Sequence, residues 1–151
     1  MLKILATICI IGMATSSCTS KKASRTESSH EAEPELTMIV GTYTSGDSKG
    51  LYSFRFNEEN GTATALSEAE VENPSYLVPS ADGKFIYAVS EFSNDQAAAN
   101  AFAFNKEEGT FRLLNTQKTE GEDPCYIITN GSNVITANYS GGSISVFPID
   151  K

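Results

Sequence analysis

Three short apolar stretches of the chain each end in a pair of polar residues that could do chemistry. The pairs are Thr42 with Tyr43, Ser90 with Glu91, and Asn138 with Tyr139. Glu91 is the one carboxylate among them, so it is the best candidate for a general base that activates water. The hydroxyl and amide groups could bind substrate or donate hydrogen bonds to developing negative charge. In the alternative interpretation, the Ser and Asn side chains satisfy backbone groups in turns and the tyrosines pack.

The sequence offers no metal site. The chain has three cysteines with no Cys-x-x-Cys spacing, and its one histidine, His30, has no partner at ligand spacing. Glu120, Glu122 and Asp123 form an acidic cluster that could attract a cation, but we interpret them as charges on a solvated turn. We therefore expect neither a metal nor another cofactor.

The overall charge excludes one class of partner. The net charge is −8, and the eleven Lys and Arg residues are spread along the chain with no basic run longer than the pair Lys21 and Lys22. Nucleic-acid binders carry a clustered basic face that neutralises phosphates, so we expect no nucleic-acid partner. The same acidity provides no evident cradle for a phosphorylated substrate.

The first 18 residues have the pattern of an export signal. Lys3 precedes an apolar run over residues 4–13, which is too short to cross a bilayer as a helix but suits a signal-peptide core. Small residues then lead to Cys18, as in the lipobox of bacterial lipoproteins, although Thr15 stands where that pattern prefers Leu. We expect residues 1–18 to be a lipoprotein signal, Cys18 to be acylated, and the protein to be anchored to a bacterial membrane facing the periplasm. Plain secretion, with Cys18 an ordinary thiol, is the alternative.

Residues 19–36 are polar and rich in Ser, with mixed charge and no hydrophobic period. This composition predicts a disordered tether. His30 lies inside it and is interpreted as a solvated residue rather than a catalyst.

The remaining chain repeats itself. Residues 53–62 (SFRFNEENGT) match residues 101–110 (AFAFNKEEGT) at an offset of 48. The segment IYAVSE at 86–91 matches VITANY at 134–139 and, upstream, MIVGTY at 38–43, each again at 48. NPSYLV at 73–78 matches DPCYII at 123–128 at an offset of 50. Repeats of this length built from short strands are typical of β-propeller blades.

The repeats predict an all-β chain with about two and a half four-stranded blades over residues 37–151. A β-sandwich with accidental similarity is the alternative. A blade cannot bury both of its faces alone, so neighbouring blades must stack. We expect ten strands, with the opening strand of the first blade absent and the third blade cut short. On this basis we expect the chain by itself to be poorly folded and inactive.

The blocks GTYTSGDSKGLYSFRFNEENGT, NPSYLVPSADGKFIYAVSE and PCYIITNGSNVITANYSGGSISVFPID resemble the start of the 6-phosphogluconolactonase-like lactonase family. The resemblance covers about residues 37–150 and implies the N-terminal part of a seven-bladed ring. Many family members have Pro-Cys-His where this chain has Pro124, Cys125 and Tyr126. The resemblance places the family's catalytic histidine and arginines in later blades, with no counterpart before Lys151.

The resemblance implies a carboxylic-ester hydrolase that opens a sugar or aldonic lactone, with a small-molecule lactone as its partner. An exported enzyme would rarely meet 6-phosphogluconolactone, a cytosolic metabolite, so a different lactone is favoured. A non-enzymatic exported propeller that serves as a binding or scaffold module is the alternative, because propellers host many functions.

Overall fold

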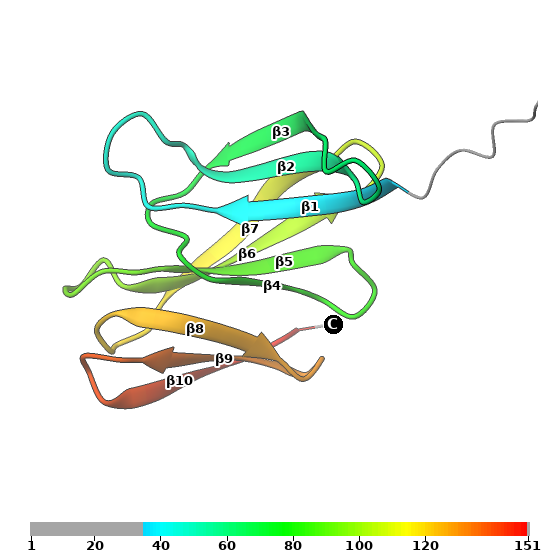
Figure 1. The fold of residues 1–151 in the computed structure, drawn as a ribbon. Helices are drawn as coiled ribbons and strands as arrows, with labels where there is room; N and C mark the ends of the chain where they lie inside the picture. The colour runs from blue at the N-terminus through cyan, green and yellow to red at the C-terminus, as the bar shows by residue number, and fades with distance from the viewer. Residues whose placement is uncertain (1–34, 151) are drawn as a thin grey trace, which may run out of the picture. The chain divides into compact units, whose positions relative to one another are not determined.

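The computed structural model describes residues 35–150, which form ten β-strands in three antiparallel sheets (Figure 1). The signal segment, Cys18 and His30 lie outside the described residues. The strands are β1 (Glu35–Gly41), β2 (Gly50–Asn57), β3 (Ala63–Glu70), β4 (Leu77–Pro79), β5 (Phe85–Ser90), β6 (Ala98–Asn105), β7 (Thr110–Lys118), β8 (Pro124–Thr129), β9 (Asn133–Asn138) and β10 (Ser143–Pro148).

The sheets follow the repeat in order. The first sheet is β1-β2-β3, the second is β4-β5-β6-β7, and the third is β8-β9-β10. Each is an antiparallel meander in which strands adjacent in sequence pair with each other. The predicted all-β propeller fold is confirmed. β1 begins at Glu35, so it includes the last two residues of the segment for which a tether is expected.

Two apolar cores lie on opposite faces of the second sheet. Along β5, Ile86 and Ala88 pack in a cluster with Leu51 of the first sheet, whereas Tyr87 and Val89 pack with Ile127 and other residues of the third sheet. Successive side chains of a strand point to opposite faces, so this division follows directly from the strand period of two. β5 is apolar at nearly every position because both of its faces are buried between neighbouring blades (Figure 1).

The first and second sheets also meet at the turn between β6 and β7. The buried Ser53 hydroxyl donates a 2.6 Å hydrogen bond to the carbonyl of Gly109. Gly109 has a φ of +73°, and a Cβ there would lie 2.7 Å from atoms of Leu66 and Ser53. Only glycine therefore allows this turn to approach the neighbouring sheet so closely.

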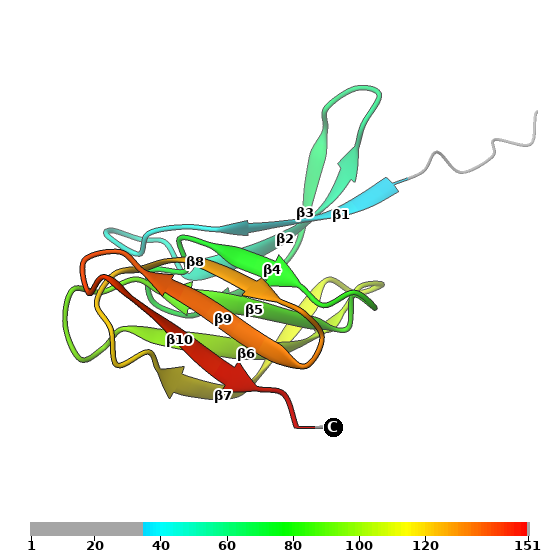
Figure 2. The ribbon, with the colours of Figure 1, turned by 90° about the horizontal axis from the view of Figure 1, so that it is seen from below.

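The third sheet leaves apolar surface open. Ile144 and Val146 on β10 are 69% and 53% exposed. A groove of about 660 Å³ lies between the second and third sheets, lined by Phe85, Leu114, Phe147 and Ile149 among others. Figure 2 shows β10 lying at the edge of its sheet, with β9 between it and β8.

Candidate functional site

The three polar pairs lie where β1, β5 and β9 end, and all three lie at the same end of the stacked sheets. Backbone hydrogen bonds join the loops there in a repeating pattern. The N–H of Glu91 donates to the carbonyl of Asn73 at 3.0 Å, and the N–H of Tyr139 donates to the carbonyl of Asp123 at 2.8 Å. We call this the Glu91 end of the sheets.

Asn73 holds three segments of the Glu91 end together. Its Oδ1 accepts hydrogen bonds from the backbone N–H and the hydroxyl of Thr44, each at 3.0 Å, and its Nδ2 donates to the carbonyl of Glu91 at 3.3 Å. Asn73 has a φ of 47°, a left-handed conformation that Asn tolerates better than most residues. Asp123, its equivalent in the next repeat, has a φ of 50°.

The Glu91 carboxylate accepts two hydroxyl groups from different loops. The Tyr43 hydroxyl donates to Oε2 at 2.9 Å, and the Ser75 hydroxyl donates to the same oxygen. Tyr43 and Glu91 occupy equivalent positions of adjacent blades, so this contact joins one blade to the next. The structure thus brings together Tyr43 and Glu91 from the residues that sequence analysis singled out.

The electrostatics of this cluster keep Tyr43 protonated. Its hydrogen bond to Glu91 is the main factor that raises the pKa of the Tyr43 phenol above its ordinary value, with smaller contributions from burial and from the charge of Glu91. A carboxylate stabilises the neutral phenol because phenolate beside it would be a like charge. Tyr43 is therefore a hydrogen-bond donor across the neutral pH range.

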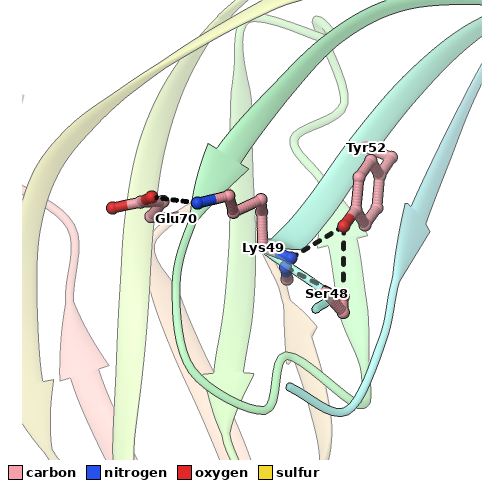
Figure 3. A network of polar contacts seen from close by, with 5 residues as sticks. Ser48, Lys49, Tyr52 and Glu70 are labelled. Atoms are coloured by element: carbon pink, nitrogen blue, oxygen red, sulfur yellow. Dashed lines mark hydrogen bonds and ion pairs between the residues drawn. The ribbon is translucent and has the colours of Figure 1, made fainter. Parts of the chain in front are cut away.

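Thr42 closes the loop between β1 and β2. Its hydroxyl contacts Ser48 Oγ and donates to the carbonyl of Gly50 at 3.1 Å. Figure 3 shows the continuation of this network, in which the Tyr52 hydroxyl lies 3.2 Å from Ser48 Oγ and accepts the Lys49 N–H at 2.7 Å. Thr42 therefore has a structural role in the loop.

Ser90 and Asn138 are buried at the ends of their strands. Ser90 is 6% exposed and accepts a 2.9 Å hydrogen bond from Asn100 Nδ2. Asn138 is 2% exposed and donates to Ser143 Oγ at 3.1 Å and Ser145 Oγ at 2.9 Å. The contacts of both residues are hydrogen bonds to other side chains of their own sheets.

Tyr139 is the most exposed of the candidates, with 81% of its surface accessible. Cys125 occupies the position in its repeat that Ser75 occupies in the preceding one. It is exposed and forms no disulfide. Its neighbour Tyr126 packs against Tyr76 with ring centroids 4.8 Å apart. The opening strands of two blades thus contact each other through their tyrosines.

Sequence reasoning missed Ser75 and Asn73 as members of the site. The signal that could have found them is the match of NPS at 73–75 to DPC at 123–125, which places an Asn or Asp before a buried proline in both repeats. In the structure Ser75 follows the buried Pro74, and its hydroxyl donates to Glu91 just after the end of β5.

Positive charge is scarce at the Glu91 end. Lys49 and Lys118 lie there, and each pairs with a carboxylate, at 2.8 Å from Glu70 and 3.7 Å from Asp95. The other basic residues between positions 35 and 150 lie toward the opposite end: Arg55, Lys84, Lys106 and Arg112. Among residues 35–150, no three His, Cys, Asp or Glu side chains are grouped closely enough to hold a metal ion.

Two grooves lie apart from this cluster. One of about 210 Å³ is lined by residues of the loop after β5 and of the segment at the end of β7, including Asp95, Lys118 and Glu120. The other is the groove between the second and third sheets, which includes Phe85 and Val134 near the starts of β5 and β9. Tyr43, Ser75 and Glu91 line neither of these grooves. Tyr43 is exposed, whereas Ser75 and Glu91 are half-buried.

Residues 37–151 match the model of the lactonase family of seven-bladed β-propellers, and the chain belongs to this family. The chain is 36% identical over 118 residues to a 6-phosphogluconolactonase of Bacillus subtilis, which covers 74% of this chain and 33% of that protein. It is 33% identical over 121 residues to a 6-phosphogluconolactonase of Formosa agariphila, covering 76% of this chain and 34% of the relative. The chain thus spans about a third of the length of these curated relatives.

Solved structures show the same relationship. A structure described as a candidate 6-phosphogluconolactonase of Bacteroides fragilis is 73% identical, with a TM-score of 0.76 over 78% of this chain and 33% of that one. The periplasmic gluconolactonase of Pseudomonas aeruginosa is 28% identical, with a TM-score of 0.71 over 78% of this chain and 35% of that one. The family assignment made from the repeat motifs is confirmed.

Proposed function

We propose that the whole protein is a lactonase that hydrolyses the cyclic ester of a sugar acid. The observation that carries this proposal is the match of nearly all of the described residues to relatives named as 6-phosphogluconolactonases. Water would attack the lactone carbonyl, the ring C–O bond would break, and the product would be an open-chain hydroxy acid. Glu91 is the candidate that these blades contribute to substrate binding, and the family resemblance assigns the catalytic groups to blades beyond them.

Acid release tests this proposal directly. Each lactone ring that opens near neutral pH releases one proton, so a pH-stat follows hydrolysis without a coupled enzyme. We expect the whole protein to accelerate hydrolysis of at least one member of a panel that includes glucono-δ-lactone, galactono-γ-lactone and 6-phosphoglucono-δ-lactone. Rates equal to the buffer rate on every lactone would overturn the proposal and favour the non-enzymatic binding module.

We also propose that the protein is exported and anchored through an acylated Cys18. The apolar run at 4–13 and the small residues before Cys18 support this, as does the periplasmic location named for the Pseudomonas relative. Between residues 35 and 150, no helix is long and apolar enough to cross a membrane. Radioactive palmitate should label the wild-type protein, and Cys18→Ala should abolish both labelling and membrane fractionation. Membrane-free wild-type protein without label would contradict the anchor.

A further inference from the structure

We propose that Glu91, together with the hydroxyls of Tyr43 and Ser75, forms a subsite that binds adjacent hydroxyl groups of an uncharged polyol ring. With the function proposed above, the ligand class is an unphosphorylated aldonolactone. Only the lactone character of the ligand rests on that function, because the recognition of hydroxyl groups stands on the geometry of the cluster.

The Glu91 carboxylate has unused capacity to accept hydrogen bonds. Both hydroxyl donors meet on Oε2, and within residues 35–150 no hydrogen bond reaches Oε1. A carboxylate has about four acceptor positions, and its two oxygens can accept the two hydroxyls of a vicinal diol. Hydrogen bonds to an ionised group are also stronger than those between neutral groups.

The hydroxyl donors around Glu91 can adapt to a ligand. Tyr43 is 56% exposed, so its hydroxyl can turn from Oε2 to a ligand oxygen without moving buried atoms. Tyr43 and Ser75 can each donate and accept a hydrogen bond, as a sugar hydroxyl does. The backbone that carries the cluster is held in place by Asn73, so binding requires little ordering of the loops.

The charge at the Glu91 end is predominantly negative. The two lysines there are already paired with carboxylates, and the loops of the same end carry further acidic residues that pair with neither lysine: Asp47, Glu72, Glu120, Glu122 and Asp123. A phosphate group would be repelled by these carboxylates, whereas neutral hydroxyl groups would not. The cluster therefore favours the unphosphorylated ring.

The experiment measures binding without chemistry. The probe is 1,5-anhydro-D-glucitol, a neutral polyol ring with no carbonyl to hydrolyse, titrated into the whole protein and followed by NMR. We expect Glu91→Gln to weaken binding about tenfold, the loss associated with a charged hydrogen bond. The matched control is Glu72→Gln, which makes the same charge change at an exposed residue of the same end and should leave the affinity unchanged. The thermal transition of each variant establishes that it is folded.

The 6-phosphate of the same probe tests the charge argument. We expect it to bind more weakly than the neutral ring, with the difference shrinking as salt screens the repulsion. Equal affinities for wild type and Glu91→Gln, tighter binding of the phosphate, or no binding of the neutral probe would each overturn the subsite. Probe binding that depends on Glu91, in a protein that hydrolyses no lactone, would support the subsite while overturning the proposed function.

Discussion

Two hydroxyl groups from separate loops donate hydrogen bonds to one oxygen of Glu91. This arrangement depends on residues that sequence analysis did not select as candidates. Asn73 ties the loop that carries Tyr43 to the end of β5 that carries Glu91. Ser75, which follows the buried Pro74 shortly before β4, also donates a hydrogen bond to Glu91. Single residues at this end can therefore be tested separately for their electrostatic and their positioning roles.

The phenol of Tyr43 should titrate above the pH of an ordinary tyrosine. Because its pKa in the folded protein is raised, its contribution to stability is present at lower pH and is lost as the pH rises through that folded pKa. Glu91→Gln removes the carboxylate and should lower the pKa of Tyr43 toward the ordinary value. Carbon NMR of ring-labelled tyrosine measures this shift, with Tyr43→Phe identifying the signal. An identical titration in wild type and Glu91→Gln would refute the contact.

Asn73 should contribute to stability through both its side chain and its backbone conformation. Asn73→Ala removes the acceptor for Thr44 and puts a residue that disfavours φ near 47° at that position, so we expect a loss of about 1–3 kcal/mol. Asn73→Asp keeps the acceptor and introduces the residue found at the equivalent position 123, so its loss should be smaller. Urea unfolding of the whole protein compares the two. Equal losses would argue against the role given to Oδ1.

Two equivalent turns, one between β2 and β3 and one between β6 and β7, each contain a glycine at the same position of the repeat. Gly61 and Gly109 are repeat equivalents with φ of 72° and 73°. A Cβ at Gly61 would meet no atom within 4 Å, whereas one at Gly109 would collide with Leu66 and Ser53 of the neighbouring sheet. The two turns thus share a backbone conformation but differ in packing.

Alanine at these two positions should separate conformation from packing. Gly61→Ala should cost about 1 kcal/mol of unfolding free energy, from the left-handed conformation alone. Gly109→Ala should cost that amount plus about 1–3 kcal/mol for overpacking between sheets. Thermal and urea unfolding give both values. Equal losses of stability in the two variants would show that the turn at Gly109 does not pack closely against the first sheet.

The strands could be predicted from sequence because the repeats align their apolar residues, and the structure has the ten strands that the repeats predict. The burial of Ser90 and Asn138 could not be predicted, because the sequence does not distinguish a polar residue that faces solvent at a strand end from one that faces a buried partner. The buried partner of Ser90 is Asn100, which lies on the neighbouring strand β6. The hydrogen bond from Ser75 to Glu91 depends on the path of the chain around Pro74, which composition alone does not reveal.

In the molecule as a whole, the second sheet is covered on both faces and the third on one. The open face of the third sheet carries Ile128, Ile144 and Val146, which are 43%, 69% and 53% exposed. An exposed apolar sheet face with an unpaired edge strand tends to associate with other chains. The described blades therefore depend on a neighbouring surface.

Residues 19–151 made alone should associate through this face. Gel filtration with light scattering should find oligomers or aggregates, and replacing Ile144 and Val146 together by Lys should reduce them because charges disfavour strand pairing. Replacing exposed Thr62 by Lys, on another blade, is the control and should change nothing. A monodisperse wild-type monomer with a cooperative thermal transition would contradict the prediction.

In the whole protein, the Glu91 end of these blades should face the hydroxyl groups of a lactone substrate. The most direct measurement is kcat/KM for D-glucono-δ-lactone and for δ-valerolactone, which has the same ring size without hydroxyl groups. Glu91→Gln should lower kcat/KM for gluconolactone about tenfold more than for valerolactone, because only the first offers hydroxyls to the carboxylate. Equal losses on both substrates, or no loss on either, would contradict the account.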